Sequence, residues 1–217
     1  IYPDSEQQAL IARTFGCVRF VYNRFLHLRK ETYDASGETL NYVKTSAQLT
    51  QLKKELTWLK EVDSISLQES LRDLDFAYQN FFCRLKQGKK PGYPRFKSKH
   101  DSRKSYKTKQ HINNGKPTIW VDSANIRLPK LGLVKCRVYK EVKGRILSAT
   151  VSQNPSGKYF VALCCTDVEI APLPCTGAVV GLDMGLKSFV ITSDGVEYPN
   201  HRYLRKSQKK LARLQRQ

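Results

Sequence analysis

The sequence lacks several patterns that assign a protein to a class quickly. Its six cysteines form no C-x-x-C pair, so the usual zinc-binding spacing is missing. No apolar run is long enough to cross a membrane, and no signal-peptide pattern is present. We therefore expect buried, reduced thiols in a cytoplasmic protein with no membrane partner. The chain starts with Ile1 rather than Met, so we interpret it as part of a longer sequence.

Acidic residues are nearly missing from two segments, although the chain holds 19 of them. Eleven Lys or Arg and one acid lie between Arg84 and Lys109, and seven Lys or Arg and no acid between His201 and Gln217. Outside these two segments the net charge falls from +19 to +2. This concentration favours a polyanionic partner, with a solvated basic surface or tail as the alternative.

The first basic segment also contains aromatic rings and turn residues. Its aromatic residues are Tyr93, Phe96 and Tyr106. Cations bind phosphates and flat rings stack on bases, so this mixture favours nucleic acid. A membrane surface is less suitable, because no apolar helical face accompanies the cations.

The region before this segment is predicted to be a bundle of about four helices, because its apolar residues recur at helical spacing. We expect Asp4 or Ser5 to cap the first helix and Gly16 to divide it. Capping boxes that begin at Thr45 and Ser66 are expected to open two further helices.

After residue 117 the apolar period becomes two, which predicts short strands of a small antiparallel sheet or barrel. The strand-like stretches are "TIWV", "NIRL", "LVKCRVY", "ILSATVSQ" and "KYFVALCCT". The tetrapeptide "NPSG" predicts a hairpin turn between the last two. A linker, "APLPCTG", then leads to a second strand pair with the turn "SDG", and a basic helix follows.

Asp183 is a carboxylate within that second pair of apolar strands, in "VVGLDMGLKSFVITSDG". Burying an unpaired charge is costly, so the residue needs an explanation. It is interpretable as a turn-capping Asp, as the phosphate-and-metal strand of an actin or sugar-kinase fold, or as the first metal-ligand strand of an RNase H-like nuclease. The last class holds two divalent ions with several carboxylates. The stretch alone leaves all three open.

The chain as a whole resembles the TnpB (OrfB) family of transposon-encoded, RNA-guided DNA endonucleases. The resemblance rests on "GYPRFKSK", "LPKLG" and "GLDMGLKSF", which follow the family's order, and it covers essentially the whole chain. The actin-like interpretation then falls away, because that motif opens its domain and is not preceded by basic helices and a barrel.

The resemblance implies an α+β multidomain fold in which a helical bundle is inserted into a small antiparallel β-barrel. Residues 1–9 and 105–174 would form this barrel, the wedge domain. Residues 10–104 would form the helical recognition domain, with a helix-turn-helix-like start. Residues 175–217 would be the truncated start of an RNase H-like (RuvC) α/β domain.

The resemblance also implies roles for individual residues. Asp183 matches the first catalytic carboxylate, which is a magnesium ligand. Tyr42, Ser46 and Gln68 are assigned to reading the short DNA motif next to the target. The cations expected to bind guide RNA and target DNA are Lys89, Lys90, Arg95, Lys97, Lys99, Arg103, Lys104, Lys107, Lys109, Arg205, Lys206, Lys209 and Lys210.

The chain departs from the family after the Asp183 strand. The family has a later catalytic Glu, a later Asp and usually a C-x-x-C zinc element, whereas no acid follows Glu197 here. Asp194 and Glu197 are poorly placed as substitutes, so we expect Zn²⁺ only in a missing carboxyl-terminal part and no DNA cleavage by this chain alone.

The expected function is accordingly that of the amino-terminal part of a magnesium-dependent nuclease. Its partners would be a guide RNA from the transposon end and double-stranded target DNA with a short adjacent motif, in a prokaryotic cytoplasm and at the nucleoid when DNA is bound. The alternatives are a nuclease-dead RNA-guided or plain DNA-binding repressor, and an RNA chaperone or ribosome-associated protein that binds many RNAs alike.

Overall fold

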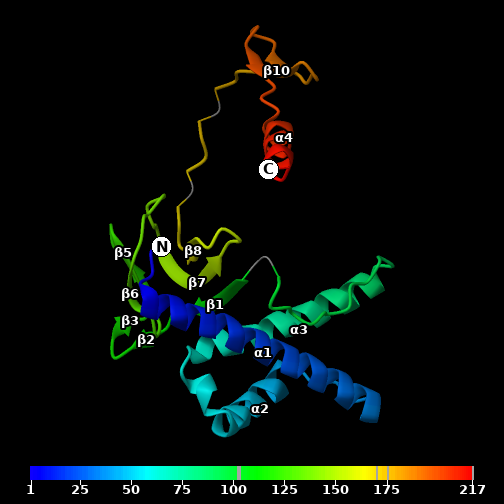
Figure 1. Cartoon of the computed structure of the whole chain (residues 1–217), viewed down its shortest axis with the longest axis vertical. Coiled ribbons are helices and arrows are strands. Elements are labelled where there is room, and N and C mark those ends of the chain that lie inside the picture. Colours follow the sequence, from blue (N-terminus) through cyan, green and yellow to red (C-terminus); the bar gives the residue numbers. More distant parts are fainter. Residues whose placement is uncertain (102–103, 170, 175, 217) are drawn as a thin grey trace. The chain divides into compact units, whose positions relative to one another are not determined.

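The computed structural model describes residues 1–101, 104–169, 171–174 and 176–216 and confirms the α+β class (Figure 1). The chain divides into two compact units, Ile1–Glu169 and Ile170–Gln217. The helices of the first unit are α1 (Ser5–Ser36), α2 (Tyr42–Glu55), the 3₁₀-helix η1 (Thr57–Lys60) and α3 (Ser64–Lys86). None of the helices among the described residues is both long and apolar enough to span a membrane.

Helix α1 is one uninterrupted helix of 32 residues, so the expected break at Gly16 is wrong. A glycine in a helix interior costs only about 1 kcal/mol relative to alanine. Burial of Phe15, Val18 and neighbouring residues on the same helix outweighs that cost. The predicted start is confirmed, because the Asp4 carboxylate accepts the Gln7 backbone N–H at 2.8 Å.

The other two long helices begin earlier than their predicted capping boxes. The N-cap of α2 is Asn41, and the N-cap of α3 is Asp63. Thr45 and Ser66 lie inside their helices, where each hydroxyl donates back toward the cap residue, at 3.0 Å and 2.9 Å. Asp63 also accepts the Thr108 hydroxyl at 2.6 Å, which ties the start of α3 to the strand at the end of the basic segment.

The first unit contains open antiparallel sheets. One has the order β1-β7-β8, from β1 (Lys104–Lys109), β7 (Arg145–Gln153) and β8 (Tyr159–Thr166), and the hairpin turn predicted at "NPSG" joins the last two. Another has the order β4-β5-β6, from β4 (Trp120–Val121), β5 (Asn125–Leu128) and β6 (Gly132–Lys135). A two-stranded ribbon pairs β2 (Ile112–Asn113) with β3 (Lys116–Pro117).

These sheets do not close into the expected barrel within the described part of the chain. The amino terminus joins them by local links: Tyr2 bridges to Lys135, the last residue of β6, and the Ile1 terminal nitrogen donates to the Tyr159 carbonyl on β8. The short strands, two to four residues in β2 to β6, offer too few ladder bonds for continuous closure.

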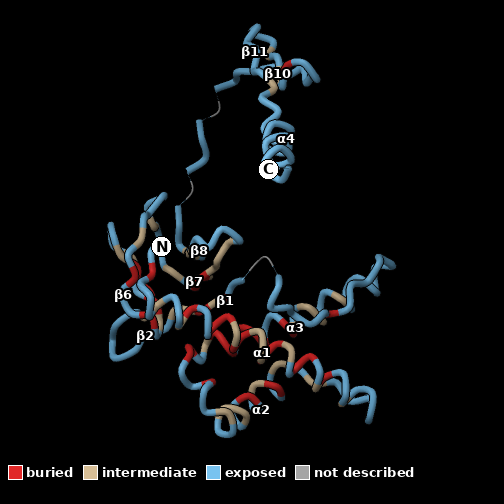
Figure 2. The backbone as a smooth tube through the Cα atoms, viewed as in Figure 1, coloured by how far each residue is buried: buried red, intermediate tan, exposed pale blue. Residues whose placement is uncertain are grey.

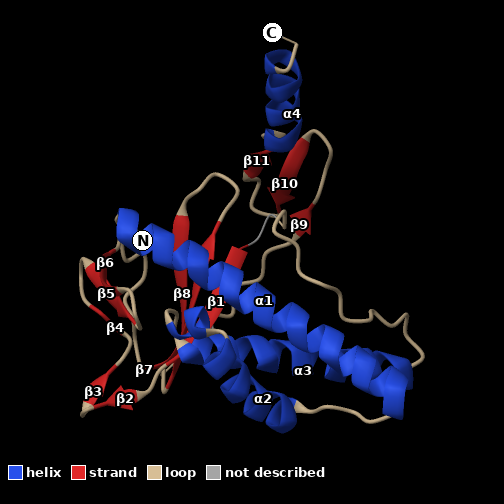
Figure 3. Ribbon diagram, turned by 60° about the horizontal axis from the view of Figure 1, so that its bottom comes forward, coloured by secondary structure: helices blue, strands red, loops and turns tan. Residues whose placement is uncertain are grey.

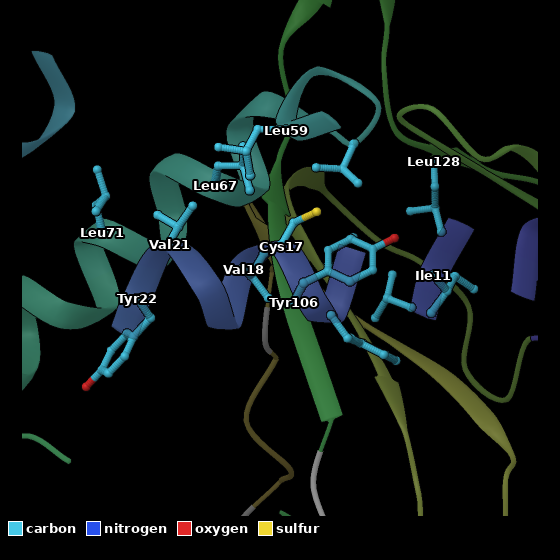
Figure 4. Packing of buried hydrophobic residues seen from close by; sticks show 14 of the residues in the cluster. Ile11, Cys17, Val18, Val21, Tyr22, Leu59, Leu67, Leu71, Tyr106 and Leu128 are labelled. Carbon is cyan, nitrogen blue, oxygen red and sulfur yellow. The ribbon is translucent and has the colours of Figure 1, made fainter. Parts of the chain in front are cut away.

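The core of the first unit is continuous from the helices into the sheets (Figure 2). Helices α1 and α3 both pack against β1, as Figure 3 shows. Tyr106 of β1 is buried and makes an edge contact with Phe15 of α1, with ring centroids 5.8 Å apart. In the close view, Tyr106 lies among α1 residues and reaches toward Leu128 of β5 (Figure 4).

The second unit is a three-stranded meander followed by a helix. Its strands are β9 (Leu182–Asp183), β10 (Ser188–Thr192) and β11 (Glu197–Pro199), in the order β11-β10-β9, and its helix is α4 (Tyr203–Leu214). The turn predicted at "SDG" is present, and Gly195 has a left-handed φ of 78° there. Among its described residues only Ser188 is buried.

The cysteines do not all follow the expectation of buried thiols. Cys17 is buried, but Cys83 on α3 and Cys164 on β8 are exposed. Cys83 lies in the last turns of α3, beyond that helix's buried residues. Cys164 and the half-buried Cys165 alternate on β8, as adjacent strand residues must. Cys175 lies outside the described residues.

Candidate nucleic-acid interface

The basic segment Arg84–Lys109 is divided among the end of α3, an extended stretch and strand β1. The extended stretch is fixed to α1 by two hydrogen bonds with one side chain. The Asn23 amide donates to the Lys97 carbonyl at 2.9 Å, and the Lys97 backbone N–H donates to the Asn23 side-chain oxygen at 2.8 Å. This stretch therefore lies along α1 and does not hang free as a tail.

Lys97, one of the cations predicted to bind nucleic acid, has an intramolecular partner. Its ammonium lies over the ring of Tyr22, 4.2 Å from the ring centroid, although much of the residue is exposed. Desolvation there lowers the pKa of Lys97, while Asp73 and Asp101 oppose that effect. Lys97 therefore helps to hold the extended stretch against α1, in addition to carrying a positive charge.

Lys107 and Lys109 on β1 compensate a buried acid. The Glu69 side chain, only 5% exposed, forms ion pairs with Lys109 at 2.9 Å, Arg72 at 3.2 Å and Lys107 at 3.5 Å. A carboxylate that is this deeply buried needs cations and donors around it. These two lysines therefore stabilise the packing of β1 on α3, and their predicted contact with nucleic acid remains a prediction.

The other predicted cations of this segment are exposed, and no ion pair engages them within the described part of the chain. They are Lys89, Lys90, Arg95, Lys99 and Lys104. We refer to these five as the strap cations. Arg103 lies outside the described residues. The strap cations are the predicted nucleic-acid contacts of this segment that remain available to phosphates.

The residues assigned to DNA-motif reading lie on the contacting helices α2 and α3. The Arg72 guanidinium lies over the Tyr42 ring, 4.3 Å from its centroid. Ser46 follows Tyr42 by one turn on α2, and Gln68 precedes Arg72 by one turn on α3. The structure thus links the two helices through Tyr42 and Arg72. Sequence reasoning missed Arg72, although its spacing of four from Gln68 places both on one helix face.

A cationic face of α1 was also missed. A shallow cavity of about 460 Å³ lies on this helix, lined by Gly16, Arg19, Phe20, Asn23, Arg24 and His27. The lining residues recur at intervals of three and four, which is the signal that could have indicated one polar face. The available space above Gly16, where a Cβ would meet no atom within 4 Å, keeps this face open.

Asp183 is exposed on β9, so the premise of a buried carboxylate is wrong. It pairs with Ile191 of β10, which pairs on its other side with Glu197 of β11. The Glu197 carboxylate accepts the Ser188 hydroxyl, whereas no hydrogen bond of the described residues uses the Asp183 carboxylate. The part of the chain that the structure describes contains no group of three or more His, Cys, Asp and Glu suited to a metal.

The remaining predicted cations lie on α4. Arg205, Lys206, Lys209 and Lys210 are all exposed. The apolar residues Leu204, Leu211 and Leu214 of the same helix are exposed too. Helix α4 is therefore amphipathic, but its apolar face buries nothing within its described unit.

Comparison with known proteins decides to which family the chain belongs. Residues 1–38 match the OrfB-type helix-turn-helix domain family. A "Putative RNA-guided DNA endonuclease" of Streptomyces pristinaespiralis is 39% identical over 220 residues, 99% of this chain and 52% of that protein. The "Putative RNA-guided DNA endonuclease InsQ" of Escherichia coli K12 is 34% identical over 217 residues, 99% of this chain and 51% of that protein. The chain belongs to the TnpB (OrfB) family.

This TnpB-family chain spans about half the length of those two curated relatives. A third relative, "Virulence protein VsdF" of Salmonella dublin, is 38% identical over 109 residues, which is 46% of this chain and 89% of that protein. The residues that match the helix-turn-helix domain contain a single helix, α1, which ends at Gly37 with a left-handed φ of 69°. The helix that follows the turn is α2, outside the match.

Proposed function

We propose that this TnpB-family chain binds a guide RNA and the target DNA of an RNA-guided DNA endonuclease. The observation that carries the proposal is the set of strap cations, which the fold leaves without ion-pair partners within the described residues. The backbone of the stretch that bears most of them is held along α1 by Asn23 at Lys97. The names of the two long relatives support the same function.

The two nucleic acids are assigned to different surfaces. The strap cations and the cations of α4 are proposed to contact the backbone of the guide RNA and its duplex with the target. The α2–α3 face with Tyr42, Ser46 and Gln68 is proposed to read the short motif beside the target. The link between Tyr42 and Arg72 holds the two helices of that face together. The cell compartment in this proposal is the prokaryotic cytoplasm.

For the catalytic part, we propose that β9 to β11 and α4 begin an RNase H-like domain, and that the small sheets of the first unit form an open wedge domain. Asp183 would supply one ligand to magnesium there. The residues present do not fit a complete magnesium site, because the described chain offers no cluster of carboxylates around Asp183. We therefore assign DNA binding to this chain and expect no cleavage by it alone.

A nuclease-dead, RNA-guided or plain DNA-binding repressor is the second candidate. The exposed strap cations support it as they support the nuclease, because binding to phosphates requires no catalytic carboxylate. The two candidates share the binding surfaces and differ only in whether a complete protein cuts. Cleavage of target DNA by a family protein that contains this segment, and its loss in the Asp183→Ala variant with guided binding retained, would decide for the nuclease.

Binding is tested by the salt dependence of affinity for RNA from the transposon end. Replacing all five strap cations by Gln should flatten the slope of log K against log salt by up to roughly four units, at about 0.7 to 0.9 per lost phosphate contact. A control variant replaces three exposed lysines outside the strap, Lys130, Lys140 and Lys158, and should change the slope little. An unchanged slope in the strap variant would remove these cations from the interface, and equal affinity for unrelated RNAs would favour an RNA chaperone.

A further inference from the structure

A cavity of about 800 Å³ lies between the last turns of α1, the loop that leads to α2, and the carboxyl-terminal half of α3. Its aromatic lining consists of Tyr33, Tyr78, Phe81, Phe82 and Tyr93. Tyr93 belongs to the extended basic stretch, so that stretch closes one side of the cavity. This is a concave site with several flat rings, which none of the roles described above uses.

The rings are arranged by contacts with one another. Tyr78 and Phe82 stack with an interplanar angle of 24°, and Phe81 meets the edge of Tyr93 at 5.3 Å between centroids. The Tyr78 and Tyr93 hydroxyls lie 3.0 Å apart. Even so, Phe82 remains 50% exposed and Tyr33 59% exposed. The fold thus positions large rings without covering them.

Arg29 gives this cavity a polar element. It lines the cavity and is only 7% exposed, and its guanidinium pairs with Asp75 at 2.8 Å and lies 5.1 Å from the Tyr78 ring centroid. Its Nε–H has no acceptor within the described part of the chain. That Nε is itself covered by protein, so the polar contribution of Arg29 to the cavity is the charge of its guanidinium.

Cations lie along the chain on both sides of the aromatic rings. Lys30 lines the cavity itself. Arg84 and Lys86 follow Phe82 on α3, and Lys89 and Lys90 of the strap follow them. A strand of nucleic acid with its phosphates on these cations would pass beside the exposed rings.

We propose that this cavity takes an unstacked nucleobase from the single strand whose phosphates lie on the neighbouring cations. A base matches both halves of the site, because its faces stack on aromatic rings and its edge carries acceptors for Lys30, the exposed cation of the lining. An apolar protein segment would fill the cavity but leave Lys30 and the neighbouring cations without partners. The inference rests on the proposed function, since it requires that the chain bind nucleic acid.

The test uses the 217-residue chain and two single-stranded oligoribonucleotides of equal length, one with bases and one abasic. Phe82→Ala should weaken binding of the base-bearing strand about tenfold and leave the abasic strand unaffected, because stacking is lost while charge is kept. Phe76→Ala is the matched control: Phe76 lies on the same helix and is 59% exposed, but it does not line the cavity. It should change neither affinity.

A second readout locates the base. Photocrosslinking of an oligoribonucleotide that carries 4-thiouridine should attach it to Tyr33, Phe82 or Tyr93. If Phe82→Ala melts at a lower temperature than the parent chain, Tyr33→Ala on the opposite helix replaces it, with the same expected loss. An unchanged ratio of base-bearing to abasic affinity in both variants would overturn the inference and favour an apolar protein segment as the occupant.

Failure of the proposed function would look different. In that case the parent chain would bind neither strand, and the strap variant would have no effect. Binding of both strands that depends on the strap cations but not on Phe82 or Tyr33 would leave the proposed function standing and reject the base-binding cavity.

Discussion

The two units of the chain have similar local structure but very different burial. In the first unit, apolar residues of α1, η1, α3 and the sheets form one buried cluster. In the second, described residues such as Leu182, Leu186 and Phe189 are exposed, although they too belong to strands or their turns. Strand and helix patterns therefore arise in both units, but among the described residues it is those of the first unit that pack into the buried cluster that converts an apolar stripe into stability.

The difference in burial should have its largest measurable effect on the rates of backbone hydrogen exchange. Backbone amides in the middle of α1 and α3 are expected to exchange only through global unfolding, whereas amides of β9 to β11 and α4 should exchange through local opening. The two sets should differ by about 5 kcal/mol or more in opening free energy. Mass-spectrometric exchange of the intact chain measures this directly. Equal protection in the two units would contradict the contrast in burial.

A core truncation in the first unit should have the next largest effect. Leu71 on α3 is fully buried, so Leu71→Ala should lower the free energy of unfolding by about 2–5 kcal/mol. The matched change in the second unit is Leu204→Ala on α4, where the side chain is largely exposed, and it should cost at most about 0.5 kcal/mol. Urea unfolding followed by circular dichroism compares them. Similar losses for both would mean that α4 is packed as firmly as α3.

A third prediction separates the paired lysines from the strap cations. Replacing Lys107 and Lys109 by Gln leaves the buried Glu69 with only Arg72, so stability should fall by about 1–3 kcal/mol. The five-residue strap variant should unfold within about 0.5 kcal/mol of the parent chain, because its members have no ion pair among the described residues. Thermal melts of both variants provide the measurement. An unchanged melting temperature in the Lys107→Gln, Lys109→Gln double variant would contradict this prediction. It would show that the two lysines are not needed to compensate the buried charge of Glu69.

The sequence predicted those elements whose signal is local. The start of α1, the apolar stripes of α1 and α3 and two hairpin turns depend on residues within a few positions of one another. The apolar pattern did not predict strand β1, although the family resemblance placed residues 105–174 in the barrel. Three lysines surround the buried Tyr106 and Thr108 and give the stretch the composition of a basic loop. Its strand partner, β7, lies some 40 residues further along the chain.

The sequence predicted which residue types make up the candidate site, but not which other residues these side chains contact. The cations were recognised by type and density, but their partners Asn23 and Glu69 lie far away in sequence. Nothing in a basic run distinguishes Lys109, which compensates a buried acid, from Lys99, which is exposed. The aromatic cavity was equally hidden, since its walls come from α1, α3 and the extended stretch.

The smallest effect is expected at Asp183 within this chain. If it is a prospective metal ligand, Asp183→Ala should change the free energy of unfolding by less than about 0.5 kcal/mol, because the side chain is exposed and no hydrogen bond of the described residues uses it. If Asp183 capped a turn, the same change would cost about 0.5–2 kcal/mol.

Adding Mg²⁺ makes the comparison of the parent chain with Asp183→Ala more discriminating. A cation that binds only the native state raises its stability in proportion to the logarithm of its concentration above Kd. A single exposed carboxylate binds Mg²⁺ poorly, because such ions are held by several oxygen ligands in near-octahedral geometry. We therefore expect the melting temperatures of the parent chain and of Asp183→Ala to stay equal, with and without millimolar Mg²⁺. A magnesium-dependent rise in the parent chain that Asp183→Ala abolishes would mean that further ligands from this chain gather around Asp183. The assignment of DNA binding without cleavage would then be wrong.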